Sequence, residues 1–259
     1  TKHYLCKNKL FNQDFFKDIK MKTSDKVFAE KIYLFLSTLF ITSLVVSNII
    51  FQKFFYWYPI DFSLFGQPLF EISVGLLPYP LTFLITDLIS EIYGKKRANT
   101  VVVLGIFASF FSAGILLLGN ILPAVDYSPI DDNLYEKVFS LSPIAALASM
   151  IAYLIAQFVD IRIYHFWKKL TKGKKLWLRN NFSTFASQFL DSVSVVGLLC
   201  FFNILSWDNF LGLALASFIF KVFVALIDTP FLYIFVHFFR KRFSLDIGEE
   251  INWNIDKDE

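Results

Sequence analysis

The chain is poor in the residues that make a protein water-soluble. Only 18% of its 259 residues are charged, whereas 56% are hydrophobic and 19% are aromatic. A soluble domain carries roughly a quarter of its residues as Asp, Glu, Lys and Arg. The shortage of charge therefore excludes a water-soluble globular protein and indicates an integral membrane protein.

Cysteine and histidine are also scarce, and their positions exclude the usual metal and redox centres. Cys6 lies in a basic N-terminal segment and Cys200 in an apolar run, so the chain has neither a disulfide framework nor a C-x-x-C motif. His3, His165 and His237 lack the spacing of metal ligands, and we expect them to be interfacial side chains. The sequence predicts no metal and no cofactor.

The motifs of nucleotide hydrolysis and of common hydrolases are absent as well. No G-x-x-x-x-G-K-[ST] loop is present, so we expect that the chain does not hydrolyse ATP by itself. No H-E-x-x-H or G-x-S-x-G sequence is present either. An intramembrane hydrolase with Asp87 and Glu91 as general acid and base remains the alternative of a different class. Product formation by the purified protein would establish it.

What the chain does have is a series of long apolar runs. Each run of about 20 residues is long enough to cross a hydrocarbon layer of about 30 Å as a helix. No run alternates apolar and polar residues as a membrane β-strand does, and the first run lacks the cleavage site of a signal peptide. The sequence therefore predicts an all-α membrane protein, a bundle of six transmembrane helices at about 32–53, 73–94, 98–122, 142–168, 181–205 and 210–240.

Three parts follow from these runs: a basic N-terminal tail over 1–30, a six-helix transmembrane domain over 31–240 and a C-terminal tail over 241–259, and both tails are assigned to the cytoplasm below. In the first tail, Phe11, Phe15 and Ile19 have the spacing of an amphipathic helix on the membrane surface. The segment 54–72 is rich in aromatic residues and suits a membrane interface, with a short hairpin around Phe65 and Gly66.

Basic residues occur in alternate gaps between the runs. All of the 25 lysines and arginines except Lys53, Lys137, Arg162 and Lys221 lie in the N-terminal tail, the second-to-third gap, the fourth-to-fifth gap or the C-terminal tail. The remaining gaps are mainly acidic, with Asp61, Glu71, Asp126, Asp131, Asp132, Glu136 and Asp208. The positive-inside rule then places both termini in the cytoplasm and the protein in the cell (inner) membrane. Basic residues this close to helix ends are explained by topology and lipid headgroups, so we expect no nucleic-acid partner.

Several ionisable residues nevertheless lie inside the runs: Asp87, Glu91, Asp160, Arg162, Asp191, Lys221 and Asp228. A charge at the middle of a membrane helix costs about 2.5–3.5 kcal/mol, so such groups usually face the bundle interior. Glu91 and Arg162 lie near helix ends, from which their side chains can reach the inner interface. Interhelical hydrogen bonding is the alternative explanation for these polar residues.

The fourth and fifth runs carry the same pair of polar groups. Gln157 and Asp160 in the one correspond to Gln188 and Asp191 in the other, an amide and a carboxylate at i, i+3. Carboxylates accept from ring N–H and amino groups and an amide donates to a carbonyl, so this set suits the edge of a purine-like base. The 33 phenylalanines include candidates for stacking on a flat ring. The sequence thus favours a flat polar heterocycle as ligand.

Four segments of the chain resemble the queuosine precursor transporter family, also called the vitamin uptake transporter family. They are PYPLTFLITDLISEIYGKKRA, AYLIAQFVDIRIYHFWKK, LRNNFSTFASQFLDS and FKVFVALIDTPFLY, and the resemblance covers about 32–240. It implies a six-helix membrane importer of 7-deazaguanine compounds for queuosine in tRNA: 7-cyano-7-deazaguanine, 7-aminomethyl-7-deazaguanine or queuine. The matching positions imply substrate-binding roles for Asn48, Asp87, Gln157, Asp160, Thr184, Gln188, Asp191, Lys221 and Asp228.

Some functional questions stay open at this level. We expect Lys221 to hold Asp191 or Asp228 charged in the empty site, with entry of the ligand exchanging that ion pair for ligand contacts. The alternative within transport is the substrate-binding membrane subunit of an energy-coupling-factor transporter for a small vitamin-like heterocycle, which would borrow an ATPase. The sequence leaves open the preferred deazaguanine, the driving ion and the oligomeric state, homo-oligomers included.

Overall fold

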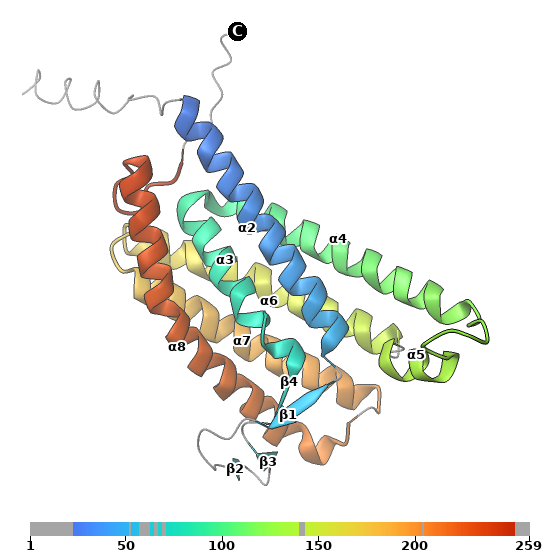
Figure 1. Cartoon of the computed structure of the whole chain (residues 1–259). Coiled ribbons are helices and arrows are strands. Elements are labelled where there is room, and N and C mark those ends of the chain that lie inside the picture. Colours follow the sequence, from blue (N-terminus) through green and yellow to red (C-terminus); the bar gives the residue numbers. More distant parts are fainter. Residues whose placement is uncertain are drawn as a thin grey trace, which may run out of the picture.

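A computed structural model of the chain describes residues 23–51, 53–56, 63–64, 67–68, 71–139, 143–203 and 205–251. This described part is built mainly of α-helices (Figure 1). The helices are α2 (Thr23–Ile50), α3 (Tyr79–Ile92), α4 (Gly94–Ile121), α5 (Asp132–Phe139), α6 (Pro143–Leu170), α7 (Leu176–Phe201) and α8 (Phe210–Phe243), with 3-10 turns η2 (Val74–Leu76) and η3 (Trp207–Asn209). The all-α class expected from the sequence is confirmed. The expected surface helix around Phe11 and Phe15 lies outside the described residues.

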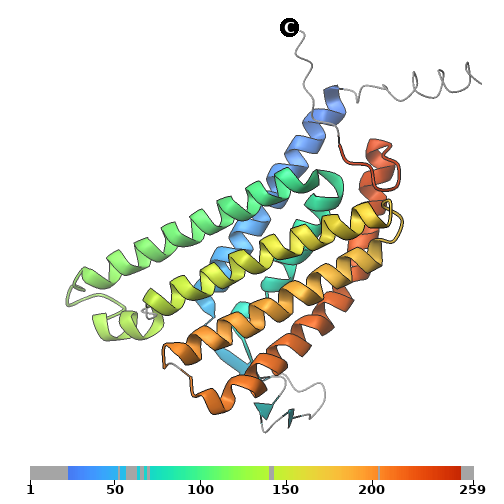
Figure 2. The ribbon, with the colours of Figure 1, turned by 180° about the vertical axis from the view of Figure 1, so that it is seen from behind.

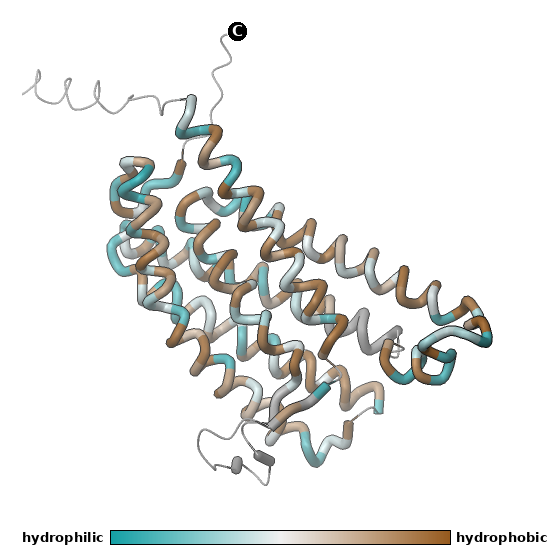
Figure 3. Tube along the Cα trace, viewed as in Figure 1, coloured by the Kyte–Doolittle hydropathy of each residue, from teal (hydrophilic) through white to brown (hydrophobic). Residues whose placement is uncertain are grey.

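Four of these helical segments are long and apolar enough to cross a membrane. They are Thr23–Ile50, Gly94–Ile121, Leu176–Phe201 and Trp207–Phe243. Large apolar side chains point outward from them, for example Phe107 at 70% exposure on α4 and Ile234 at 63% on α8. Hydrophilic residues gather where α2 begins and α8 ends, and in the loop that holds α5 (Figure 3). An apolar outer surface around a polar interior is the arrangement that a lipid environment favours.

Helix α3 is shorter than the expected span at 73–94. It has 14 residues and is therefore about 21 Å long. Pro80 occupies its first turn, where a missing backbone N–H costs nothing, and Gly94 follows its C-terminal end with a φ of 82° that favours glycine. Helix α4 begins at that same glycine. The helix α5 was not expected from the sequence, because its eight residues do not form an apolar run.

The order of packing places α3 inside the bundle. Along the series α2, α4, α6, α7 and α8, each helix packs against the next, and α3 contacts α2, α4, α6 and α8 (Figures 1 and 2). Ten residues of α3 are buried, Asp87 and Glu91 among them. The two carboxylates thus lie on a helix that is enclosed by others, which explains how an apolar segment tolerates them.

Both described ends of the chain lie at the same end of the bundle. Helix α2 begins there, α8 ends there, and the α3–α4 and α6–α7 turns lie there as well (Figures 1 and 2). We call this the basic end, because those turns and the last turn of α8 carry Lys95, Lys96, Lys168, Lys169 and Arg240. The basic residues that occur in alternate gaps of the sequence therefore lie together at one end of the folded bundle.

The opposite end of the bundle carries the strands, α5 and η3 (Figure 1). Strand β1 (Phe54–Tyr56) pairs antiparallel with β4 (Glu71–Ser73), and β2 (Ser63–Leu64) pairs antiparallel with β3 (Gln67–Pro68). The short hairpin predicted around Phe65 and Gly66 is confirmed by this second pair. Ser73 closes the segment onto the bundle by donating its hydroxyl to the carbonyl of Phe51 at 2.5 Å.

Candidate functional site

A cavity of about 410 Å³, its open mouth included, lies between α3, α7 and α8. The side chains that line it come mainly from one face of each helix: Tyr79, Pro80, Phe83, Leu84 and Asp87 of α3, Asn180, Thr184 and Gln188 of α7, and Phe220, Lys221, Val224, Ala225 and Asp228 of α8, with Leu76 of η2. On every helix the spacing is close to three or four residues, which is the period of one helical face. One face of each of three helices, which are far apart in the sequence, thus lines the same cavity.

Five of the sequence-predicted residues line this cavity: Asp87, Thr184, Gln188, Lys221 and Asp228. Gln157, Asp160 and Asp191 are buried but do not line it. Asn48 lies elsewhere, between α2 and α4, where its amide donates to the hydroxyl of Ser109 at 3.3 Å. The structure therefore brings most of the predicted set to one region and leaves Asn48 out of it.

Lys221 is neutralised by Asp191 at the cavity wall. Its Nζ lies 2.6 Å from Oδ2 of Asp191 and 3.3 Å from the hydroxyl of Ser192. The Tyr79 hydroxyl donates to the same Asp191 oxygen at 2.6 Å, and the lysine ammonium lies 5.1 Å from the centre of the Tyr79 ring. Of the two partners that the sequence allowed for Lys221, the structure selects Asp191. Such a buried pair is tolerated only when hydrogen bonds of this kind surround it.

Asp87 and Asp160 form a second buried pair, made of two acids. Their carboxyl groups lie within hydrogen-bonding range of one another, and Asp160 also accepts from the hydroxyl of Ser187 at 3.0 Å. Asp87 is 2% exposed and Asp160 is fully buried. Two carboxyl groups can hydrogen-bond only when one of them carries a proton. The structure thus places two acidic side chains next to one another beside the cavity.

The two amide–carboxylate pairs that look alike in the sequence have different surroundings. Gln157 donates to the Tyr153 hydroxyl at 2.7 Å and accepts from Thr86 at 3.3 Å, so its amide is used within the wall. Gln188 lines the cavity, and its Oε1 is buried without a hydrogen-bond donor among the described residues. Of the two amides, Gln188 is therefore the one that presents a free acceptor at the cavity.

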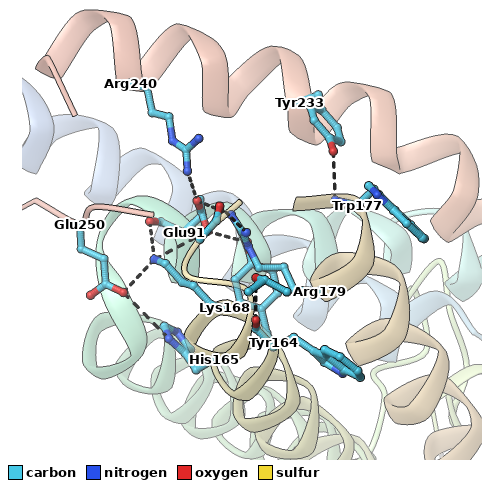
Figure 4. Close-up of polar contacts among 12 residues, drawn as sticks. Glu91, Tyr164, His165, Lys168, Trp177, Arg179, Tyr233, Arg240 and Glu250 are labelled. Carbon is cyan, nitrogen blue, oxygen red and sulfur yellow. Dashed lines mark hydrogen bonds and ion pairs between the residues drawn. The ribbon is translucent and has the colours of Figure 1, made fainter. Parts of the chain in front are cut away.

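A separate ionic cluster surrounds Glu91 at the basic end (Figure 4). The Glu91 side chain is fully buried, and its Oε1 accepts from Arg179 at 2.6 Å and also from Arg240. Its Oε2 accepts from the Tyr164 hydroxyl at 3.0 Å. The idea that Glu91 reaches the inner interface from a helix end is wrong, because cations from α7 and α8 come to it instead. Arg162, by contrast, is exposed, and its contact with the inner interface stays a prediction.

The segment after α8 joins this cluster. Lys168 lies 3.6 Å from Glu91 and 2.8 Å from Glu250, and the backbone N–H of Ile251 donates to the carbonyl of Ile92 at 2.8 Å. Figure 4 shows Glu250 reaching Lys168 from the side away from Arg179. The cluster thus ties α3, α6, α7, α8 and the chain after α8 together at the basic end.

The two carboxylates proposed for an intramembrane hydrolase do not share a site. Asp87 faces the cavity beside Asp160, whereas Glu91 is held by two arginines and a tyrosine. A general acid and base must both reach the reacting group. Glu91 is not placed to do so. The structure therefore does not support Asp87 and Glu91 as the acid and base of a hydrolase.

Sequence reasoning missed the uncharged part of the lining. Tyr79, Phe83 and Phe220 provide aromatic surface, and Asn180 provides an amide. Each lies four or eight residues from a polar residue that the sequence did single out, so a helical-face projection from Asp87, Thr184 or Asp228 would have found them. It also missed the burial of Arg179, which looked like a residue of the basic loop.

Comparisons with known proteins agree with this placement. A family model described as putative vitamin uptake transporter matches residues 73–235, a range that contains every cavity-lining residue. A Bacillus subtilis (strain 168) protein named probable queuosine precursor transporter is 29% identical over 162 residues, which are 62% of this chain and 70% of that protein. No solved structure matches the chain.

Proposed function

The chain belongs to the putative vitamin uptake transporter family, and from that premise we propose that it imports queuosine precursors, 7-deazaguanine compounds used in tRNA modification, across the cell membrane. The observation that carries the proposal is the cavity between α3, α7 and α8. It joins ionisable, amide and aromatic side chains inside a bundle whose outer surface is apolar. Intramembrane ionisable residues that line a cavity mark a substrate path.

The chemistry of the lining suits a flat, hydrogen-bonding ring. Asp87 offers carboxyl oxygens to ring N–H and amino groups, and Phe83 and Phe220 offer ring faces for stacking. Lys221 and the amide of Gln188 are donors for a ring carbonyl. The name of the Bacillus subtilis relative supports a deazaguanine as that ring.

We assign six of the described helices as membrane spans, namely α2, α3, α4, α6, α7 and α8, with α5 in a loop. Support comes from the regular alternation of helix ends between the two ends of the bundle, and from the enclosure of the short α3 by its neighbours (Figure 1). The basic end then faces the cytoplasm by the positive-inside rule, which puts both termini there.

The Lys221–Asp191 pair supports a simple coupling of binding to conformation. A ligand carbonyl that takes a hydrogen bond from Lys221 competes with Asp191 for that ammonium. A ligand shifts a conformational equilibrium only through a difference in affinity between states, and a rearranged ion pair provides such a difference. The Glu91 cluster ties helices together at the basic end, and we infer that release to the cytoplasm requires its contacts to rearrange.

The test is uptake of labelled queuine, 7-aminomethyl-7-deazaguanine and 7-cyano-7-deazaguanine by cells that lack other importers and express this chain. We expect uptake of at least one compound above that of cells with empty vector. An uncoupler arm separates ion-driven transport from facilitated diffusion. Copurification of ATPase subunits, with loss of uptake in their absence, would assign the chain to an energy-coupling-factor transporter instead. Uptake of none of the three compounds would contradict the proposal.

A further inference from the structure

The ionisable groups that line the cavity are not equally satisfied. Lys221 has an ion pair with Asp191, and Asp87 has the carboxyl of Asp160 beside it. Asp228 also lines the cavity but has neither a hydrogen bond nor an ion pair with any residue in the described part of the chain. It is half-buried, near the middle of α8. Among the described residues, Asp228 is thus a cavity carboxylate that no other side chain contacts by a hydrogen bond or an ion pair.

Nearby donors do not serve Asp228. Asn180, which lines the same cavity, donates its amide to the hydroxyl of Thr229 at 3.2 Å. The Thr229 hydroxyl lies 3.3 Å from the amide oxygen of Asn181 and 3.0 Å from the carbonyl of Ala225. The polar side chains around Asp228 therefore bond to one another and leave its carboxylate open to the cavity.

Asp228 and Lys221 give the cavity two chemically opposite ends. They are seven residues apart on α8, so they lie on the same face and about 10 Å apart along the helix axis. Helix α8 ends at the basic end, so Asp228 lies nearer to that end than Lys221, which lies beside Tyr79. A ligand that fits both ends has a hydrogen-bond acceptor at one side and a cation at the other.

We propose that the cavity selects ring compounds that carry a protonated amine, and that Asp228 binds the ammonium group while the ring lies against α3 and α7. This inference rests on the proposed function and narrows it: an amine-bearing deazaguanine is preferred over a neutral one of the same ring. An ammonium has three N–H donors, which suit a carboxylate that has no donor of its own. A metal ion is a poorer match, because no group of three or more His, Cys, Asp or Glu capable of holding one occurs among the described residues.

The experiment compares two probes that share a ring and differ in charge, 7-aminomethyl-7-deazaguanine and 7-cyano-7-deazaguanine. Their dissociation constants are measured by titration against the purified full chain in lipid nanodiscs. For the unaltered chain we expect the amine to bind about tenfold or more tightly, because a charge-assisted hydrogen bond is worth at least that factor. In Asp228→Asn the ratio of the two constants should approach one.

Two further variants make the result specific. Asp228→Glu keeps the charge and should keep most of the preference for the amine, which also shows that position 228 tolerates substitution. Asp208→Asn removes an exposed carboxylate in η3, outside the cavity, and should keep the full ratio.

Three outcomes would overturn the inference. They are equal affinities of the unaltered chain for both probes, an unchanged ratio in Asp228→Asn, or a larger loss of the ratio in Asp87→Asn than in Asp228→Asn, which would assign the amine to the Asp87–Asp160 pair. If neither probe binds the unaltered chain and queuine does not bind either, the proposed function itself is wrong. If only the neutral probe binds, the proposed function stands and the role of Asp228 is wrong.

Discussion

At the scale of single residues, several buried ionisable side chains in the described part of the chain contact specific neighbouring side chains. Lys221 is matched by Asp191 and Tyr79, Asp87 by Asp160, and Glu91 by two arginines. Removing one partner from such a set leaves the other charge buried and unpaired, which costs more than the pair contributes. The consequences of a substitution therefore depend on the partner that remains.

The first prediction concerns Asp191→Asn. This change removes the counter-charge of Lys221 and weakens the acceptor of the Tyr79 hydroxyl, so the wall beside the cavity loses its arrangement. We expect uptake of the proposed deazaguanine substrate to fall at least tenfold while the amount of protein in the membrane stays the same. Asp126→Asn, in an exposed loop, is the matched control and should transport normally. Normal uptake by Asp191→Asn would show that the pair has no part in transport.

At the scale of elements, α3 organises the bundle because it is enclosed and polar at once. Its cavity face carries Asp87, and its last turn carries Glu91 at the basic end. Helices α6, α7 and α8 each supply a partner to Glu91, so one carboxylate holds the ends of three helices together.

The second prediction compares two carboxylates at the basic end. Glu91→Ala leaves Arg179, fully buried, without its partner and should destabilise the fold by about 3–5 kcal/mol. Glu30→Ala removes a partly exposed ion pair with Arg97 and should cost no more than about 1 kcal/mol. Thermal unfolding in detergent, followed by intrinsic fluorescence, gives the order of the two melting temperatures. Equal shifts would mean that the Glu91 cluster does not stabilise the basic end.

The third prediction compares two glycines of α4. Gly94 has a φ of 82°, and an added Cβ there would collide with the carboxylate of Glu250, so Gly94→Ala should lower the melting temperature. Gly114 lies inside the same helix, and no heavy atom lies within 4 Å of an added Cβ. Gly114→Ala should therefore be neutral or slightly stabilising, since alanine favours a helix by about 1 kcal/mol over glycine. The same unfolding assay compares the two melting temperatures. A lower melting temperature in Gly114→Ala alone would contradict this interpretation of the turn at Gly94.

At the scale of the whole molecule, a hydrophobic core is combined with large apolar side chains on the outer surface and with many buried polar groups. Apolar side chains of α4 and α8 face outward, while carboxylates, amides and hydroxyls of α3, α6 and α7 are buried. In water the outward faces would be costly, and in lipid the inward groups must bind to each other or to a ligand. The apolar outer surface of the described bundle is therefore suited to a lipid environment.

The fourth prediction tests the topology. With Cys6 and Cys200 replaced by serine, a single cysteine is introduced either at Ser128, before α5, or at Lys174, between α6 and α7. A membrane-impermeant thiol reagent added to intact cells should label Ser128→Cys and should label Lys174→Cys only after the membrane is opened. The reverse pattern would place the basic end outside the cell, and equal labelling of both positions would exclude the six-span assignment.

The sequence by itself determined the membrane class, the apolar helices and the end of the bundle at which the basic residues gather. These properties depend on local composition, because a run of apolar residues forms a helix in lipid whatever its neighbours are. The same local reasoning predicted too long a helix for α3. Hydropathy alone does not show where a helix begins and ends, whereas Pro80 in the first turn and the positive φ of Gly94 do.

The tertiary structure alone decided which buried charges are partners. Glu91 meets Arg179 and Arg240 across 88 and 149 positions of sequence, and Lys221 chooses Asp191 over Asp228. It also showed that two glutamines in similar sequence contexts differ in their surroundings. Gln157 donates a hydrogen bond to Tyr153, whereas Gln188 lines the cavity. Pairing of charges depends on distances between helices, and these distances follow from how side chains pack rather than from the order of residues along the chain.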